Sequence, residues 1–196
     1  MKRALIATLC IALMTMICAC DPLNPSKIGS TTIFVDKEGK VTETVVEDFS
    51  MPQYSQDELN TQIAEEMAAY NATAGEDTVT LEYFTVENSI VKTQMTFRTA
   101  ADYAAFNNVP FFNGTIADAL AAGYTLDVIL KNPANEDETI GIHEILTMQD
   151  KNVFIIESAT RLRTESKILY VSDDTVIIDD YEVDAFENAD ATVIIY

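Results

Sequence analysis

Hydrophobic and polar residues alternate along much of the chain, which is the pattern expected of half-buried β-strands. Met95 and Phe97, for example, fall on one face of the segment 90–98, and polar residues fall on the other. The same alternation predicts further strands at residues 31–35, 41–47, 78–84, 126–130, 153–156, 167–171, 175–178 and 192–196. The chain is therefore expected to be rich in sheet.

Short turns are expected between several of these strands. Gly39 lies between the first two, where a tight turn favours a positive φ, so this unit is predicted to be a β-hairpin. Residues 87–89 and 172–175 are polar and are predicted to form two further hairpin turns.

Helices are predicted where apolar residues recur every three or four positions. The longest covers about 56–71, where Ser55 begins a capping-box pattern and Gly75 marks the end. Two shorter helices are expected to start at the capping residues Thr99 and Thr115. These segments lie between the predicted strands.

Strands and helices together predict an α+β fold, with an antiparallel sheet of several hairpins and about three short helices packed on it. A polar loop is expected at 132–138, followed by a short helix-like segment at 142–148. Residues 31–196 are predicted to form a single α+β domain. A subdivision near residue 150 is the alternative.

The beginning of the chain has a different pattern. Lys2 and Arg3 precede an uncharged, mostly apolar run of 16 residues at 4–19, shorter than the ~20 residues that a membrane-spanning helix needs. A short positive segment followed by such a run is typical of a secretory signal peptide. Residues 1–19 are therefore predicted to be a signal peptide.

The apolar run closes with Ile17-Cys18-Ala19-Cys20, which resembles the lipobox of bacterial lipoproteins. The resemblance implies that a signal peptidase cleaves between Ala19 and Cys20, and that the Cys20 thiol carries a diacylglyceryl group. It also implies a lipid anchor at the extracytoplasmic face of the cell membrane. An ordinary secretory signal and an uncleaved anchor are the alternatives. The stretch "STTIFVDKEGKVTETVVEDF" is similar to small lipoproteins of gut Clostridia-type bacteria.

The cysteines are consistent with this prediction. Cys10, Cys18 and Cys20 are the three cysteines of the chain, so a mature domain would have neither a disulfide nor a thiolate metal site. Residues 20–30 are expected to be the lipidated cysteine and a tether, which spans at most about 33 Å when fully extended.

Charge restricts the partners that the protein can have. The chain has 12 basic and 32 acidic residues, and loss of Lys2 and Arg3 with the leader leaves 10 − 32 = −22. Such a surface repels the phosphates of nucleic acids, so nucleic-acid binding is not expected, and it also repels anionic lipids. A hydrophobic content of 48% nevertheless allows a packed core.

No motif in the sequence specifies catalysis, a cofactor or a metal site. His143 is the only histidine and is interpreted as an ordinary surface or helix residue. A group of acidic residues has oxygen ligands that suit calcium but lacks the spacing of an EF-hand, so it is interpreted as solvated turns and edge strands. The group consists of Asp173, Asp174, Asp179, Asp180, Asp184, Glu187 and Asp190.

Three aromatic residues lie beside prolines in predicted loops. They are interpreted either as part of a ligand or partner surface or as core residues, and the core is favoured. The three are Tyr54, Phe111 and Phe112.

Three functional hypotheses follow. The leading one is a membrane-tethered binding or adaptor domain that works beside an envelope protein. A structural envelope protein is the second. The third is an enzyme on glycan or cell-wall substrates, which would have to use carboxylates as its acid and base. A carboxyl group of raised pKa in a cleft would favour the enzyme.

Overall fold

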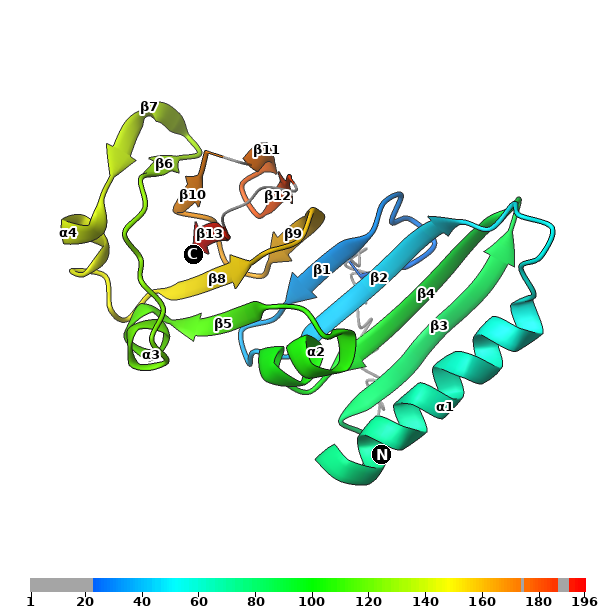
Figure 1. The fold of residues 1–196 in the computed structure, drawn as a ribbon. Helices are drawn as coiled ribbons and strands as arrows, with labels where there is room; N and C mark the ends of the chain where they lie inside the picture. Colours follow the sequence, from blue (N-terminus) through cyan, green and yellow to red (C-terminus); the bar gives the residue numbers. More distant parts are fainter. Residues whose placement is uncertain (1–22, 174, 187–190) are drawn as a thin grey trace, which may run out of the picture.

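A computed structural model describes residues 23–173, 175–186 and 191–196 of the chain. These residues form two β-sheets and four helices (Figure 1). The prediction of a mixed, mostly antiparallel α+β fold is confirmed. The prediction of one sheet is wrong, because alternation locates strands but does not say which strands pair.

Sheet A contains seven of the described strands, in the order β11-β12-β9-β1-β2-β4-β3. Its neighbours are antiparallel, apart from β1 and β9, which are parallel. The strands are β1 (Thr32–Val35), β2 (Val41–Asp48), β3 (Val79–Glu87), β4 (Ile90–Phe97), β9 (Thr160–Thr164), β11 (Thr175–Asp179) and β12 (Glu182–Ala185).

Sheet B contains six of the described strands, in the order β5-β8-β13-β10-β6-β7, and its neighbours are antiparallel. The strands are β5 (Phe111–Thr115), β6 (Leu130–Asn132), β7 (Asn135–Ile140), β8 (Asn152–Ile156), β10 (Tyr170–Ser172) and β13 (Thr192–Ile195).

The helices begin at the caps that the sequence predicts. Ser55, Thr99 and Thr115 each accept a hydrogen bond from the backbone N–H three residues further on. The first helix ends at Gly75, whose φ is +115°. The helices are α1 (Gln56–Ala74), α2 (Ala100–Asn107), α3 (Ile116–Ala121) and α4 (Ile142–Ile145), the last within the predicted helix-like segment.

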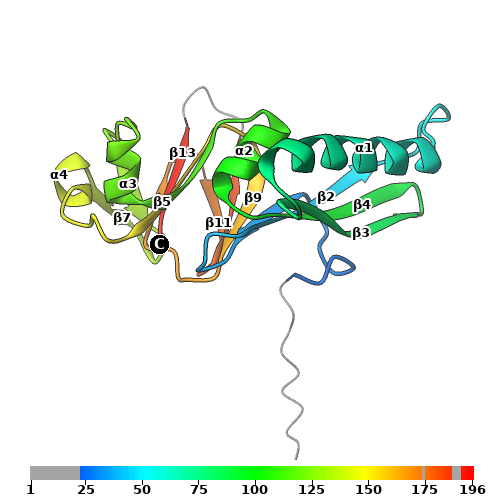
Figure 2. The same cartoon turned by 90° about the horizontal axis from the view of Figure 1, so that it is seen from below.

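One face of sheet A, which we call the inner face, is covered by α1 and α2 (Figures 1 and 2). Met95 and Phe97 of β4 point to this side and pack with Tyr103 of α2 in the larger hydrophobic core. The opposite side, which we call the outer face, carries polar residues of β4 such as Lys92 and Gln94. This alternation is the one predicted from the sequence.

Strands β8 and β13 of sheet B are buried on both faces. Phe154 and Ile156 of β8 point into the larger core between the two sheets, which we call the shared core. Val153 and Ile155 point to the other side, into a second core with α3 and α4. A chain of aromatic contacts links the two sheets within the shared core, with ring centroids 4.9–5.6 Å apart. Its members are Phe97, Tyr103, Phe111, Phe154 and Tyr196.

Several strand predictions are wrong. The polar loop predicted at 132–138 contains the end of β6 and most of β7, an edge strand whose exposed residues need no apolar alternation. Residues 126–129 are outside the described strands, although Leu126 is buried. The strands on either side of the predicted turn at 172–175 do not form a hairpin, because β10 belongs to sheet B and β11 to sheet A.

Two aromatic residues also lie in a different element from the one predicted. Phe111 and Phe112 are in β5 and not in a loop. Phe111 is buried in the shared core, and Phe112 packs against the second core and against Tyr124. The favoured interpretation of these two side chains as core residues is therefore confirmed.

Candidate interaction surfaces

The residues with the most specific sequence prediction, Ala19 and Cys20, lie outside the described residues. Asp174, Glu187 and Asp190 of the acidic group also lie outside them. His143 is exposed in α4, which confirms its interpretation as a surface helix residue.

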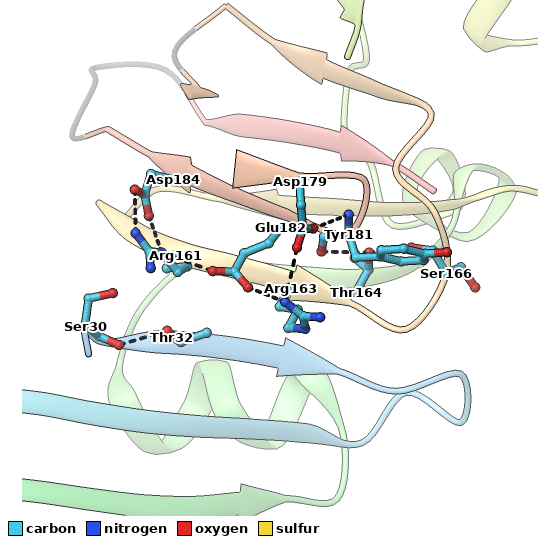
Figure 3. Close-up of polar contacts among 10 residues, drawn as sticks. All are labelled: Ser30, Thr32, Arg161, Arg163, Thr164, Ser166, Asp179, Tyr181, Glu182 and Asp184. Atoms are coloured by element: carbon cyan, nitrogen blue, oxygen red, sulfur yellow. Dashed lines mark hydrogen bonds and ion pairs between the residues drawn. The ribbon is translucent and has the colours of Figure 1, made fainter. Parts of the chain in front are cut away.

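The remaining acidic residues of the C-terminal part are mostly paired with basic side chains. Figure 3 shows Asp179, Glu182 and Asp184 beside Arg161 and Arg163 on the outer face of sheet A. Within residues 23–173, 175–186 and 191–196, no three His, Cys, Asp or Glu side chains are grouped as metal ligands would be. The carboxylates here join β12 and β11 to β9.

The strongest of these pairs is bidentate. Arg161 donates from Nε to Asp184 Oδ1 over 2.7 Å and from Nη2 to Oδ2 over 2.9 Å. These hydrogen bonds hold the pKa of the Asp184 carboxyl below its usual range. Arg163 forms the neighbouring ion pair with Glu182, and its Nη1 lies 3.7 Å from Asp179 Oδ2. These ion pairs between strands stabilise the sheet.

A cleft of about 490 Å³ lies where α1 begins, between this helix and the end of β2. We call it the α1 cleft. Leu59 and Val91 supply apolar surface, and an aromatic pair lines it, with ring centroids 5.0 Å apart. The pair is Phe49 and Tyr54. The carboxylates at the cleft belong to Glu47, Asp48 and Glu58.

Hydrogen bonds within the loop and to the turn between β3 and β4 hold the loop between β2 and α1 in place. The Phe49 N–H donates to the carbonyl of Ser89 over 2.7 Å, and the Tyr54 N–H donates to that of Met51 over 3.0 Å. Ser55 then caps α1 through the N–H of Glu58 at 3.3 Å. Tyr54 is 48% exposed, so it lines a surface and is not the core residue that the sequence favoured.

Glu43 is a partly buried carboxylate on the inner face of β2. The Tyr103 hydroxyl donates a hydrogen bond to its Oε1 over 2.9 Å, but burial dominates and raises the pKa of Glu43. Burial and the neighbouring carboxylate also raise the pKa of Tyr103. Glu43 does not line the α1 cleft, so its raised pKa does not provide the acid or base that an enzyme would need there.

Replacing Glu43 with glutamine is expected to stabilise the protein near neutral pH. The folded-state pKa lies above the unfolded one, so Glu43 favours folding below the unfolded pKa, and this contribution is lost as the pH rises through the folded pKa. Glu43→Gln keeps an oxygen for Tyr103 and removes the ionisation. Urea unfolding should show it more stable than the native protein at neutral pH and should show the difference shrinking toward about pH 4.

The matched control is Glu65→Gln on the exposed side of α1, which removes the same charge without a buried partner. A Glu43→Gln chain whose stability followed that of Glu65→Gln at every pH would contradict this prediction.

Comparisons with protein-family models, curated proteins and solved structures find no match to this chain. Among the described helices, none combines the length and the apolar character needed to cross a membrane. The surfaces above are therefore the basis for a functional proposal.

Sequence reasoning missed the α1 cleft. The capping-box pattern that begins at Ser55 does not connect Glu58 with Glu47 or Val91, because these three residues lie in different elements. The available signal was the aromatic residue Tyr54 in a proline-containing loop directly before a helix.

Proposed function

We propose that the protein is a lipid-anchored extracytoplasmic lipoprotein whose domain is a binding or adaptor module for an envelope protein. The observation that carries the proposal is the α1 cleft, which combines apolar and aromatic lining with carboxylates. Apolar contact surface and charge complementarity are the two properties that a protein-recognition site needs. The lipobox-like sequence ending at Cys20 supports the anchor and the membrane location.

The chemistry of the α1 cleft defines the partner that fits it. Leu59 is partly exposed and offers contact to apolar side chains, and Tyr54 offers a ring with a polar end. Glu58 and its acidic neighbours attract lysine and arginine. The partner is therefore a basic, amphipathic segment of an envelope protein.

Reversing one charge at the cleft should weaken the complex. Glu58→Lys removes an attraction of up to about 1 kcal/mol at a surface site and adds a repulsion of similar size. Because 1.4 kcal/mol is a factor of ten, we expect about tenfold lower capture of the partner. The measurement is in-cell crosslinking of the full-length protein, followed by quantitative mass spectrometry of the proteins that co-purify.

Asp137→Lys is the matched control, because it makes the same charge change on an exposed residue of β7 in sheet B. One abundant partner that Glu58→Lys loses and Asp137→Lys retains would support the proposal. A partner lost equally in both variants would indicate attraction to overall charge, and the absence of any reproducible partner would contradict the adaptor role.

A further inference from the structure

The predicted tether contacts the domain. Lys92 Nζ lies 2.6 Å from the carbonyl oxygen of Ile28, 3.3 Å from that of Pro25 and 3.4 Å from that of Ser26. Gln94 Nε2 donates to the carbonyl oxygen of Leu23 over 2.7 Å. Two neighbouring outer-face side chains of β4 thus hold the backbone of residues 23–28.

This docked segment lies on the outer face of sheet A. Figure 2 shows it, in blue, on the side of the sheet opposite α1. Gln94 is itself 8% exposed and also bonds Thr44 Oγ1 at 3.0 Å, so one of the two contacts is made by a buried, fixed side chain. Hydrogen bonds from Lys92 and Gln94 hold the segment to the sheet, and those from Lys92 are the stronger because the donor is charged.

The length of chain before the docked segment limits where an anchor can lie. Two residues separate Cys20 from Leu23, and a fully extended chain of three steps spans about 10 Å. A lipid attached to Cys20 therefore brings Leu23, and with it the outer face, to within about 10 Å of the point where the chain enters the bilayer surface.

The outer face carries paired charges and, next to the docked segment, apolar and aromatic side chains. Arg161 and Arg163 offset two of the three carboxylates beside them, Asp179, Glu182 and Asp184, and Lys92 lies near Glu87. Tyr83 and Ile90 line a hollow of about 260 Å³ next to Ser26 and Lys92. Tyrosine and isolated apolar side chains are common at the membrane interface.

We infer that the outer face of sheet A is the membrane-facing surface of the anchored protein, so that the bilayer covers it and α1 with its cleft points away from the lipid. This inference rests on the lipid anchor of the proposed function. It adds a fixed orientation, which a free tether would not give, because the backbone of residues 23–28 is bound to Lys92 and Gln94.

Fluorescent labels on the two sides of sheet A test the orientation. Val176→Cys places a thiol on the outer side of β11, where the side chain is 46% exposed, and Glu65→Cys places one on the exposed side of α1. Acylation consumes the Cys20 thiol, and Cys10 and Cys18 leave with the leader, so each label is unique. The full-length protein is incorporated into phosphatidylcholine–phosphatidylglycerol vesicles that contain a lipid with a nitroxide head group.

We expect the nitroxide lipid to quench the label at position 176 several-fold more than the label at position 65. Lys92→Met should reduce this difference, and Lys92→Arg should restore it. Equal quenching at the two positions, or stronger quenching at position 65, would overturn the inference.

A second measurement separates the docked segment from the anchor. Trypsin cleavage after Lys27, followed by mass spectrometry of the full chain in detergent, requires release of the segment and does not depend on a lipid. Lys92→Met should make this cleavage about tenfold faster or more, because proteolysis follows the population of the open form and a hydrogen bond to a charged group contributes about one decade to that population. Lys131→Met is the matched control.

The two failures can be told apart. If the protein does not float with the vesicles, the proposed anchor fails and the membrane-facing surface fails with it, whereas slow cleavage at Lys27 still shows that the segment is docked. If the protein floats but Lys92→Met leaves the cleavage rate at Lys27 unchanged, the anchor stands and the fixed orientation is overturned.

Discussion

Replacing Phe154 with alanine is expected to lower the free energy of unfolding by about 3–5 kcal/mol. The side chain is fully buried in β8, and its ring lies 5.6 Å from that of Phe111 and 5.1 Å from that of Tyr196. Truncation removes the ring that joins Tyr196 to Phe111 in the aromatic chain. It also leaves a cavity, which the close-packed side chains around it fill only in part.

Equilibrium unfolding in urea, followed by circular dichroism and by tyrosine fluorescence, measures this effect. Ile129→Ala is the control, because Ile129 is 63% exposed and its truncation should change the free energy by less than about 0.5 kcal/mol. The experiment also tests whether residues 31–196 form one domain. A single shared transition that shifts as a whole supports one domain, and two transitions of which Phe154→Ala shifts one would support a division near residue 150.

The sequence predicts well those elements whose signals are local. Ser55 and Thr115 identify the starts of helices because a cap is made with a residue three positions away. The hairpin of β3 and β4 follows from alternation on both strands and from a turn in which Asn88 and Ser89 have positive φ. In each case the interacting residues are close together in the chain.

Two strands of sheet A, β9 and β12, were not predicted, although β12 forms a local hairpin with β11. Charged side chains occupy the outer face of β9 and β12, namely Arg161, Arg163 and their carboxylate partners. The apolar pattern that would identify each strand is therefore short and centres on Leu162 or Val183. The parallel pairing of β1 with β9 joins residues more than a hundred positions apart. Nothing local in either segment encodes that pairing.

The candidate surfaces follow the same rule. Alternation predicts that Lys92 and Gln94 point away from the core, and the structure confirms it. Their partners are backbone carbonyls of residues 23–28, and carbonyls occur at every position, so composition does not identify them. The α1 cleft likewise depends on how the loop before α1 packs against β2 and β4.

Replacing Cys20 with serine is expected to abolish incorporation of fatty acid completely. A thioether requires the thiol, and Cys20 is the residue that the lipobox resemblance assigns to it. Two or three acyl chains, at about 0.8 kcal/mol for each buried methylene, give stable anchoring, whereas one chain is marginal. After the predicted cleavage, a charge of 10 − 32 = −22 would provide no alternative attraction to anionic lipids.

Metabolic labelling with a fatty acid and mass spectrometry of the N-terminal peptide measure the outcome. The native peptide should begin at Cys20 and carry the acyl mass, and Cys10→Ser, which removes a thiol within the apolar run, should remain labelled. Label that persists in Cys20→Ser would contradict the anchor. An unacylated N-terminus at another residue would instead show an ordinary secretory signal, and the domain would then lose the short connection to the bilayer on which its membrane-facing surface depends.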